Sequence, residues 1–92
     1  MPQVKRLVLD VLKPHSPNAL EFCEALAALG TGYRVTLKVT EVDEKTETTV
    51  ICINGNALDF PSIESCINDL GGSVHSIDEV EVRGAGAASG RA

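Results

Sequence analysis

Two short patterns with helical spacing, each lying between stretches typical of β-strands, leave few folds open to this chain of 92 residues. The expected strands and helices, in chain order, are residues 4–13, 20–29, 33–40, 48–53, 60–70 and 73–82. Residues 33–40 alternate most clearly, because β-branched and aromatic side chains there are separated by Arg34, Thr36, Lys38 and Thr40. The order is therefore strand, helix, strand, strand, helix, strand.

This order predicts an α+β fold. Strand–helix–strand connections are right-handed, and the compact solution is a ferredoxin-like βαββαβ sandwich. Its four-stranded antiparallel sheet has the order 4-1-3-2 and carries two helices on one face. Residues 1–83 are expected to form this single domain. The Gly- and Ala-rich residues 84–92 are expected to be a flexible C-terminal tail.

Capping residues predict where the helices begin and end. Ser16 followed by Pro17 is typical of an N-cap with proline at the first helical position. Asp59 is the expected cap of the second helix, which Gly71 and Gly72 then end. Both helices are thus predicted to be short and to follow directly on their capping residues.

The net charge of −5 and the scarcity of aromatic residues argue against a nucleic-acid partner. Nucleic acid is bound by a concentrated basic surface, and single strands also need aromatic side chains to stack on. The first ten residues include Lys5, Arg6 and Asp10, so we expect neither a secretory signal nor a membrane-spanning segment there. The chain is therefore expected to be cytoplasmic, with no membrane partner.

The three cysteines do not form a metal or redox motif. Cys23, Cys52 and Cys66 are far apart in the sequence and include no CxxC pair. Cys23 and Cys66 lie within apolar helical patterns, where a cysteine behaves as a small buried hydrophobic residue.

Two helices cover only one face of such a sheet, so the other face needs an explanation. The first strand places Val8 and Leu12 there, and the second adds Arg34 and Lys38. This mixture of apolar and basic side chains predicts a surface for self-association or ligand binding. The alternative is a monomer that tolerates an apolar stripe, or one in which the tail covers it.

Acidic residues gather on the last strand, which should run antiparallel to the first and beside it. Asp10 then lies close to Ser76, and the register decides its neighbours. In one register Asp78 is the next residue on the face of Asp10, and in the other His75 and Glu79 share that face. Two carboxylates with a histidine or hydroxyl can hold a divalent cation. Alternatively, these residues are solvated charges of an edge strand.

His15 follows Lys13 and Pro14 in the loop after the first strand. Loops of this kind often carry function, although this histidine can equally be a residue that only precedes the first helix.

Three stretches together resemble the signatures of an archaeal family, the domain of unknown function two-one-one. They are residues 7–15 (LVLDVLKPH), 70–72 (LGG) and 75–80 (HSIDEV). The likeness extends over about residues 2–82 and does not include the tail or the cysteines.

The resemblance implies a ferredoxin-like domain from the archaeal cytoplasm that assembles into homo-oligomers, as rings. It implies no established activity. The signature residues carried over to this chain are Asp10, His15, His75, Asp78 and Glu79. The resemblance also implies a calcium-like divalent-cation site, with Asp10 and Asp78 as metal ligands.

Two functions of different classes follow. The first is a non-enzymatic homo-oligomeric binding or regulatory module, with an unknown ligand or a divalent cation at the rim of the sheet. The second is a small enzyme that uses His15 or His75 as a base, oriented by Asp10 or Asp78. The loop after the first strand has neither the arginine that acylphosphatases use there nor the paired cysteines that copper chaperones have there, although both classes share this fold.

Overall fold

The structure, a computed structural model, describes residues 2–84. Its strands and helices are β1 (Gln3–Pro14), α1 (Ala19–Ala27), β2 (Arg34–Val42), β3 (Thr46–Asn54), α2 (Phe60–Asp69) and β4 (Ser73–Arg83). The predicted order of elements is therefore confirmed. The expected tail, residues 84–92, lies outside the described residues except for Gly84.

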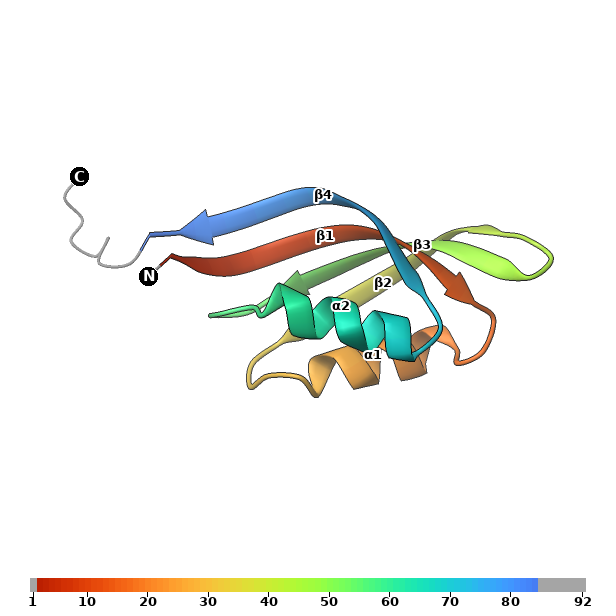
Figure 1. Ribbon diagram of the computed structural model, residues 1–92, viewed down its shortest axis with the longest axis horizontal. Coiled ribbons are helices and arrows are strands. Elements are labelled where there is room, and N and C mark those ends of the chain that lie inside the picture. Colours follow the sequence, from red (N-terminus) through yellow and green to blue (C-terminus); the bar gives the residue numbers. More distant parts are fainter. Residues whose placement is uncertain (1, 85–92) are drawn as a thin grey trace.

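The four strands form one antiparallel sheet in the order β2-β3-β1-β4. This is the predicted order 4-1-3-2 read from the opposite edge. Both helices lie on the same side of the sheet (Figure 1). The ribbon of β1 and β4 continues beyond the helices, so the start of β1 and the end of β4 lie side by side, with Gln3 paired to Arg83.

The core lies between the sheet and the helices and is almost entirely aliphatic. Along β1, Leu7, Leu9 and Val11 are buried in turn, while the residues between them are half-buried or exposed. Phe22 and Leu26 of α1 and Ile63 and Ile67 of α2 close over them with no exposed surface. The other buried apolar residues are Ile51, Ile53 and Leu58. We call the covered side of the sheet the helix side and the other the open face.

The first helix begins later than its proline suggested. Its N-cap is Asn18, not Ser16: the Asn18 side chain accepts a hydrogen bond from the Glu21 amide at 2.9 Å. The Glu21 carboxylate accepts one from the Asn18 amide in return, also at 2.9 Å. This reciprocal capping box satisfies two backbone amides at the start of the helix. Leu20, which follows, is 65% exposed and does not join the apolar stripe predicted for residues 20–29.

The end of α2 explains a pair of glycines. Gly71 has φ +91°, a left-handed conformation that strains other residues. Its amide donates to Asn68, and the Gly72 amide donates to Ile67, which closes the last turn of the helix. A Cβ on Gly72 would lie 3.0 Å from the Leu12 carbonyl oxygen and 3.3 Å from the Phe22 ring. The chain therefore passes from α2 into β4 where only glycine fits. Asp59 caps the start of α2, as predicted.

Within residues 2–84, no helix is long and apolar enough to cross a membrane.

Candidate functional site on the open face

The open face carries the side chains of β1 that alternate with its buried residues. Val8 pairs with Cys52 of β3, Asp10 with Val50, and Leu12 with Thr48. The predicted interface residues all belong to this face: Val8, Leu12, Arg34 and Lys38. Leu12 is 41% exposed, whereas Val8 is half-buried by its neighbours on the sheet. The apolar stripe expected here is therefore narrow.

A hollow of about 290 Å³ lies on this face and is lined by Asp10, Leu12, Thr48 and His75. It brings together two of the five residues singled out from the sequence, the carboxylate of Asp10 and the imidazole of His75. Next to it, Ser76 pairs with Asp10 across the two strands, and its hydroxyl donates to the Asp78 carboxylate at 2.7 Å.

Irregularities in β4 create this arrangement. Asp10 pairs with Ser76 but Val11 pairs with Val74, so His75 is an extra residue between the two pairs. Asp78 is a second extra residue, because Val8 pairs with Glu79 and Leu9 with Ile77. With a regular ladder, the sequence predicted that either His75 or Asp78, but not both, would share the face of Asp10. Each bulge adds one residue and shifts the alternation of faces, so that prediction no longer applies.

Glu79 lies farther along the same strand and is engaged elsewhere. Its carboxylate accepts a hydrogen bond from Arg6 Nε at 3.0 Å. Arg6 also donates to the side chain of Asn54 at 3.3 Å. The predicted group of candidate residues is thus divided, with Glu79 bound to an arginine on β1 and outside the hollow.

His15 lies away from the other candidates, at the tip of the β2–β3 hairpin. Its Nδ1 lies 2.9 Å from the Glu47 carboxylate, and its Nε2 lies 3.0 Å from the carbonyl oxygens of both Asp43 and Glu44. All these partners are acceptors, so only the doubly protonated ring satisfies both nitrogens. The Glu47 carboxylate, followed by the Glu44 carbonyl, accordingly raises the pKa of His15 above its ordinary value.

Glu47 also binds a lysine that sequence reasoning missed. Lys13 has no exposed surface. Its Nζ lies 3.1 Å from Glu47, donates to the Pro14 carbonyl at 2.8 Å and is 5.3 Å from the centre of the Phe22 ring. The hydrogen bond from His15, and then that from Lys13, lowers the pKa of Glu47. His15 and Lys13 thus hold the hairpin tip to the end of β1, which is a structural role.

A signal for Lys13 was present in the sequence. Lys13 is two residues beyond Val11 in the same alternation as Leu7 and Leu9, so it points to the helix side. A lysine in such a position needs an acceptor when it is buried. Nothing in the local sequence indicates that Glu47, thirty-four residues away, supplies it.

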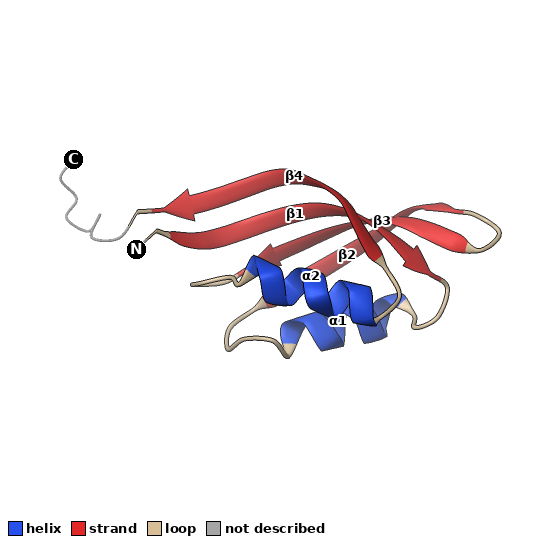
Figure 2. Cartoon of the chain, in the orientation of Figure 1, coloured by secondary structure: helices blue, strands red, loops and turns tan. Residues whose placement is uncertain are grey.

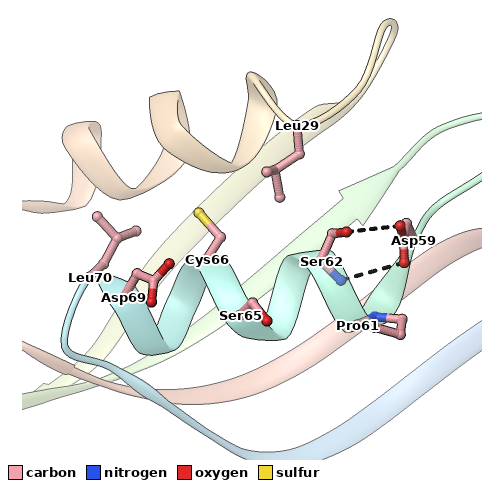
Figure 3. A pocket seen from close by; sticks show the side chains of 8 residues that line it. All are labelled: Leu29, Asp59, Pro61, Ser62, Ser65, Cys66, Asp69 and Leu70. Atoms are coloured by element: carbon pink, nitrogen blue, oxygen red, sulfur yellow. Dashed lines mark hydrogen bonds between the residues drawn. The ribbon is translucent and has the colours of Figure 1, made fainter.

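A larger groove of about 530 Å³ lies on the opposite side of the molecule, along α2 and next to Leu29, which follows α1 (Figure 3). Two of its polar residues cap the start of α2: Asp59 accepts hydrogen bonds from the Ser62 amide and hydroxyl at 3.4 and 2.8 Å. The groove also contains Cys66, and burial raises the pKa of the Cys66 and Cys23 thiols. Neither cysteine has the lowered pKa of a reactive thiol. We therefore place the candidate site in the smaller hollow.

The hollow is not a complete metal site within one copy. Across residues 2–84, no three His, Cys, Asp or Glu side chains lie close enough together to hold a metal ion. The available donors are the carboxylates of Asp10 and Asp78 and the Ser76 hydroxyl. Hard divalent cations such as Ca²⁺ prefer oxygen donors of this kind, but take six to eight of them. Water or further oxygen ligands would have to complete the coordination.

Comparison with known proteins agrees with the resemblance seen in the sequence. The model of a family described as uncharacterized ArCR, DUF211, matches residues 5–86. The chain belongs to the DUF211 family. A second comparison finds a relative, the uncharacterized protein MJ0319 of Methanocaldococcus jannaschii, which is 44% identical over 77 residues. That match covers 84% of this chain and 79% of the relative.

The three stretches on which the resemblance was based have distinct places in the fold. Residues 7–15 form most of β1 and the start of the next loop, where they supply core residues, Asp10, Lys13 and His15. The stretch 70–72 is the glycine turn after α2. Residues 75–80 form the bulged part of β4. The first and third stretches meet at the hollow, because β1 and β4 are neighbours.

Proposed function

We propose that this DUF211 protein is a non-enzymatic, homo-oligomeric binding or regulatory module on a ferredoxin-like fold that works in the cytoplasm. A small ligand or a divalent cation such as calcium binds at the rim of the sheet, near Asp10, His75 and Asp78. The observation that carries this proposal is the hollow itself, which gathers Asp10 and His75 on the face that the helices leave uncovered.

Exposed apolar side chains support the homo-oligomer. Leu12 is 41% exposed on the open face, and Ile77, Val80 and Val82 of β4 are each about half exposed. Covering aliphatic groups of this size stabilises an association, at roughly 25 cal/mol for each Å² removed from water. A second copy of the chain is always present at the same concentration as the first, so it is a partner that can cover these side chains.

The oxygen donors favour a hard cation, such as calcium, over a soft metal ion. Asp10 and Asp78 are carboxylates, Ser76 adds a hydroxyl, and the nearest nitrogen donor is His75. A calcium ion would find two negative charges here and fill its other positions with water. The bulge at His75 lets this histidine line the hollow with Asp10, while Asp78 is linked to it through the hydroxyl of Ser76, the strand partner of Asp10.

The enzyme alternative now depends on His75. Both ring nitrogens of His15 already contact acceptors, so His15 is committed to the hairpin. His75 and Asp10 line one hollow, and an imidazole beside a carboxylate can serve as a general base. This pair is the specific observation in favour of the second function.

Calorimetric titration with CaCl₂ tests the cation site. The Asp10→Asn variant should fold normally but lose calcium binding, because it removes a carboxylate without changing the shape of the side chain. Asp69→Asn is the matched control: it removes an exposed carboxylate from α2, on the other side of the molecule, and should bind as the wild type does. Unchanged binding by Asp10→Asn would show that the cation binds elsewhere. Light scattering that finds only monomers at high micromolar concentration would refute the homo-oligomer.

A further inference from the structure

Within residues 2–84, the sheet has two outer strands, β2 and β4, and each is hydrogen-bonded to one neighbouring strand only (Figure 2). β1 runs antiparallel to both β3 and β4, and β2 runs antiparallel to β3, so β2 and β4 have opposite directions. A second copy placed beside the first in the same orientation would therefore bring its β2 antiparallel to β4. The unpaired backbone groups of the two strands would then face each other.

Paired residues form rows that cross all four strands of the sheet. The two residues at the ends of a row, one on β2 and one on β4, show which side chains would meet between two copies. One row ends in Arg34 on β2 and Glu81 on β4. The next ends in Val35 and Val80, and a third ends in Leu37 and Ile77. When the rows continue into a second copy, each residue of β4 meets the β2 residue of its own row.

The apolar ends of these rows lie on the helix side. Val80 pairs with Leu7, and Ile77 pairs with Leu9, whose side chains are buried under the helices. Val80 and Ile77 themselves remain 53% and 49% exposed, whereas Val74, nearer the start of β4, packs against the core. The corresponding residues of β2, Val35 and Leu37, are only partly buried against the same core. Adding a strand beside β4 would thus extend the core.

The charged ends lie on the open face and have opposite signs. β2 contributes Arg34 and Lys38 with a single glutamate, Glu41, whereas β4 carries Asp78, Glu79 and Glu81 with a single arginine, Arg83. Glu79 is already bound to Arg6 and Glu81 contacts Arg83 at 3.5 Å, but both carboxylates are on the exposed surface. Charges on an edge strand usually prevent pairing with another edge. Here they oppose pairing of β4 with β4, or of β2 with β2, and favour pairing of β4 with β2.

We propose that β4 of one copy pairs with β2 of the next and continues the antiparallel sheet, with Glu81 opposite Arg34 and Val80 opposite Val35. This inference rests on the proposed homo-oligomer and specifies its interface. The contact joins two different surfaces, so it produces a closed ring when the rotation between copies closes and an open fibre when it does not. The row that contains Asp10 ends in Ser76 and Lys38. Assembly thus brings a lysine beside Asp78, where it competes with a bound cation.

A charge-exchange experiment tests the pairing of edges. The variant Glu79→Lys/Glu81→Lys has two basic edges, and the variant Arg34→Glu/Lys38→Glu has two acidic edges. Each should be monomeric alone by light scattering, and an equimolar mixture should assemble again, because β4 of each then faces an oppositely charged β2. The control Glu24→Lys/Glu64→Lys reverses two exposed charges on the helices and should assemble as the wild type does.

Disulfide formation tests the register and separates this interface from stacking of open faces. In a chain with Cys23, Cys52 and Cys66 replaced by alanine, Val35→Cys and Val80→Cys should form an intermolecular disulfide under mild oxidation. Both positions lie on the helix side, so copies stacked through their open faces cannot join them. In a second chain that keeps Cys52 and has only Cys23 and Cys66 replaced by alanine, cross-linking through Cys52, which lies on the open face, would indicate such stacking.

The outcomes distinguish the two proposals. If the wild type assembles but the mixture does not and no disulfide joins residues 35 and 80, the edge pairing is wrong and the homo-oligomer stands. If the wild type is monomeric, both proposals fail. Recovery of assembly by the mixture, together with the disulfide, would establish the interface.

Discussion

Single residues in this protein show how one acceptor can serve two cations. Glu47 lies between Lys13 and His15, with its two oxygens 3.1 and 2.9 Å from their nitrogens. Lys13 has no exposed surface, so its ammonium group is stabilised by Glu47 and by the Pro14 carbonyl in place of water. Removing the partner of a buried charge costs more than removing the pair. Glu47 is therefore the residue of this group whose loss the fold tolerates least.

Protonation of His15 should make the stability of the protein depend on pH. The folded state raises the pKa of His15 above its ordinary value of 6.5, so this contribution is complete below about pH 6.5 and is lost as pH rises through the folded pKa. The folded state lowers the pKa of Glu47 from 4.5, so its contribution is present above that pH and is lost on acidification. The two contributions therefore coincide between pH 4.5 and 6.5.

Urea denaturation of the wild type and of His15→Gln tests this expectation. The wild type should lose more stability than the variant between about pH 5.5 and about pH 8.5, because only the wild type has the proton at residue 15 to release. An identical change in both proteins would mean that His15 does not couple protonation to folding.

The turn from α2 into β4 shows how backbone shape limits an element. Gly72→Ala should destabilise the protein by about 1–3 kcal/mol, since its Cβ would approach the Leu12 carbonyl and the Phe22 ring. Gly84→Ala is the control, because a Cβ there meets nothing within 4 Å. Thermal unfolding followed by circular dichroism measures both. Equal melting temperatures for the two variants would show that the chain relaxes around the added methyl group.

Most elements could be predicted from the sequence because their periodicity is local. The alternation in residues 33–40 and the helical spacing of Ile63, Cys66 and Ile67 each depend on a few neighbouring residues. The bulges at His75 and Asp78 could not, since they depend on how β4 meets β1. The candidate site was therefore found only in part: Asp10 beside Ser76 followed from topology, whereas His75 in the same hollow required the irregular register.

At the scale of the whole molecule, charge is unevenly distributed. The described residues 14–33 and 46–82 contain no lysine or arginine, so both helices and nearly all of β4 are free of basic side chains. Basic residues are found on β1, on β2, in the hairpin turn and at the end of β4. A single copy thus presents edges of opposite sign, which is the property that an assembly of identical copies can use.

Assembly through these edges should weaken as salt is added. The Debye length falls from about 10 Å at 0.1 M salt to about 3 Å at 1 M, so attraction between the two edges is screened over that range. Light scattering in increasing NaCl should therefore show a shift toward monomers at fixed protein concentration. Assemblies that persist or grow in 1 M NaCl would indicate that apolar contacts alone hold the copies together.

The two bulges also determine where β4 can change in length. Loss of an unpaired residue, His75 or Asp78, would leave an ordinary ladder in which every remaining side chain keeps its side. Loss of a paired residue such as Val80 would turn the remainder of the strand over, and aliphatic and acidic groups would exchange sides. For the fold alone, insertions and deletions in β4 should therefore be tolerated at positions 75 and 78 and be disruptive elsewhere in the strand, although loss of either residue removes a side chain of the candidate site.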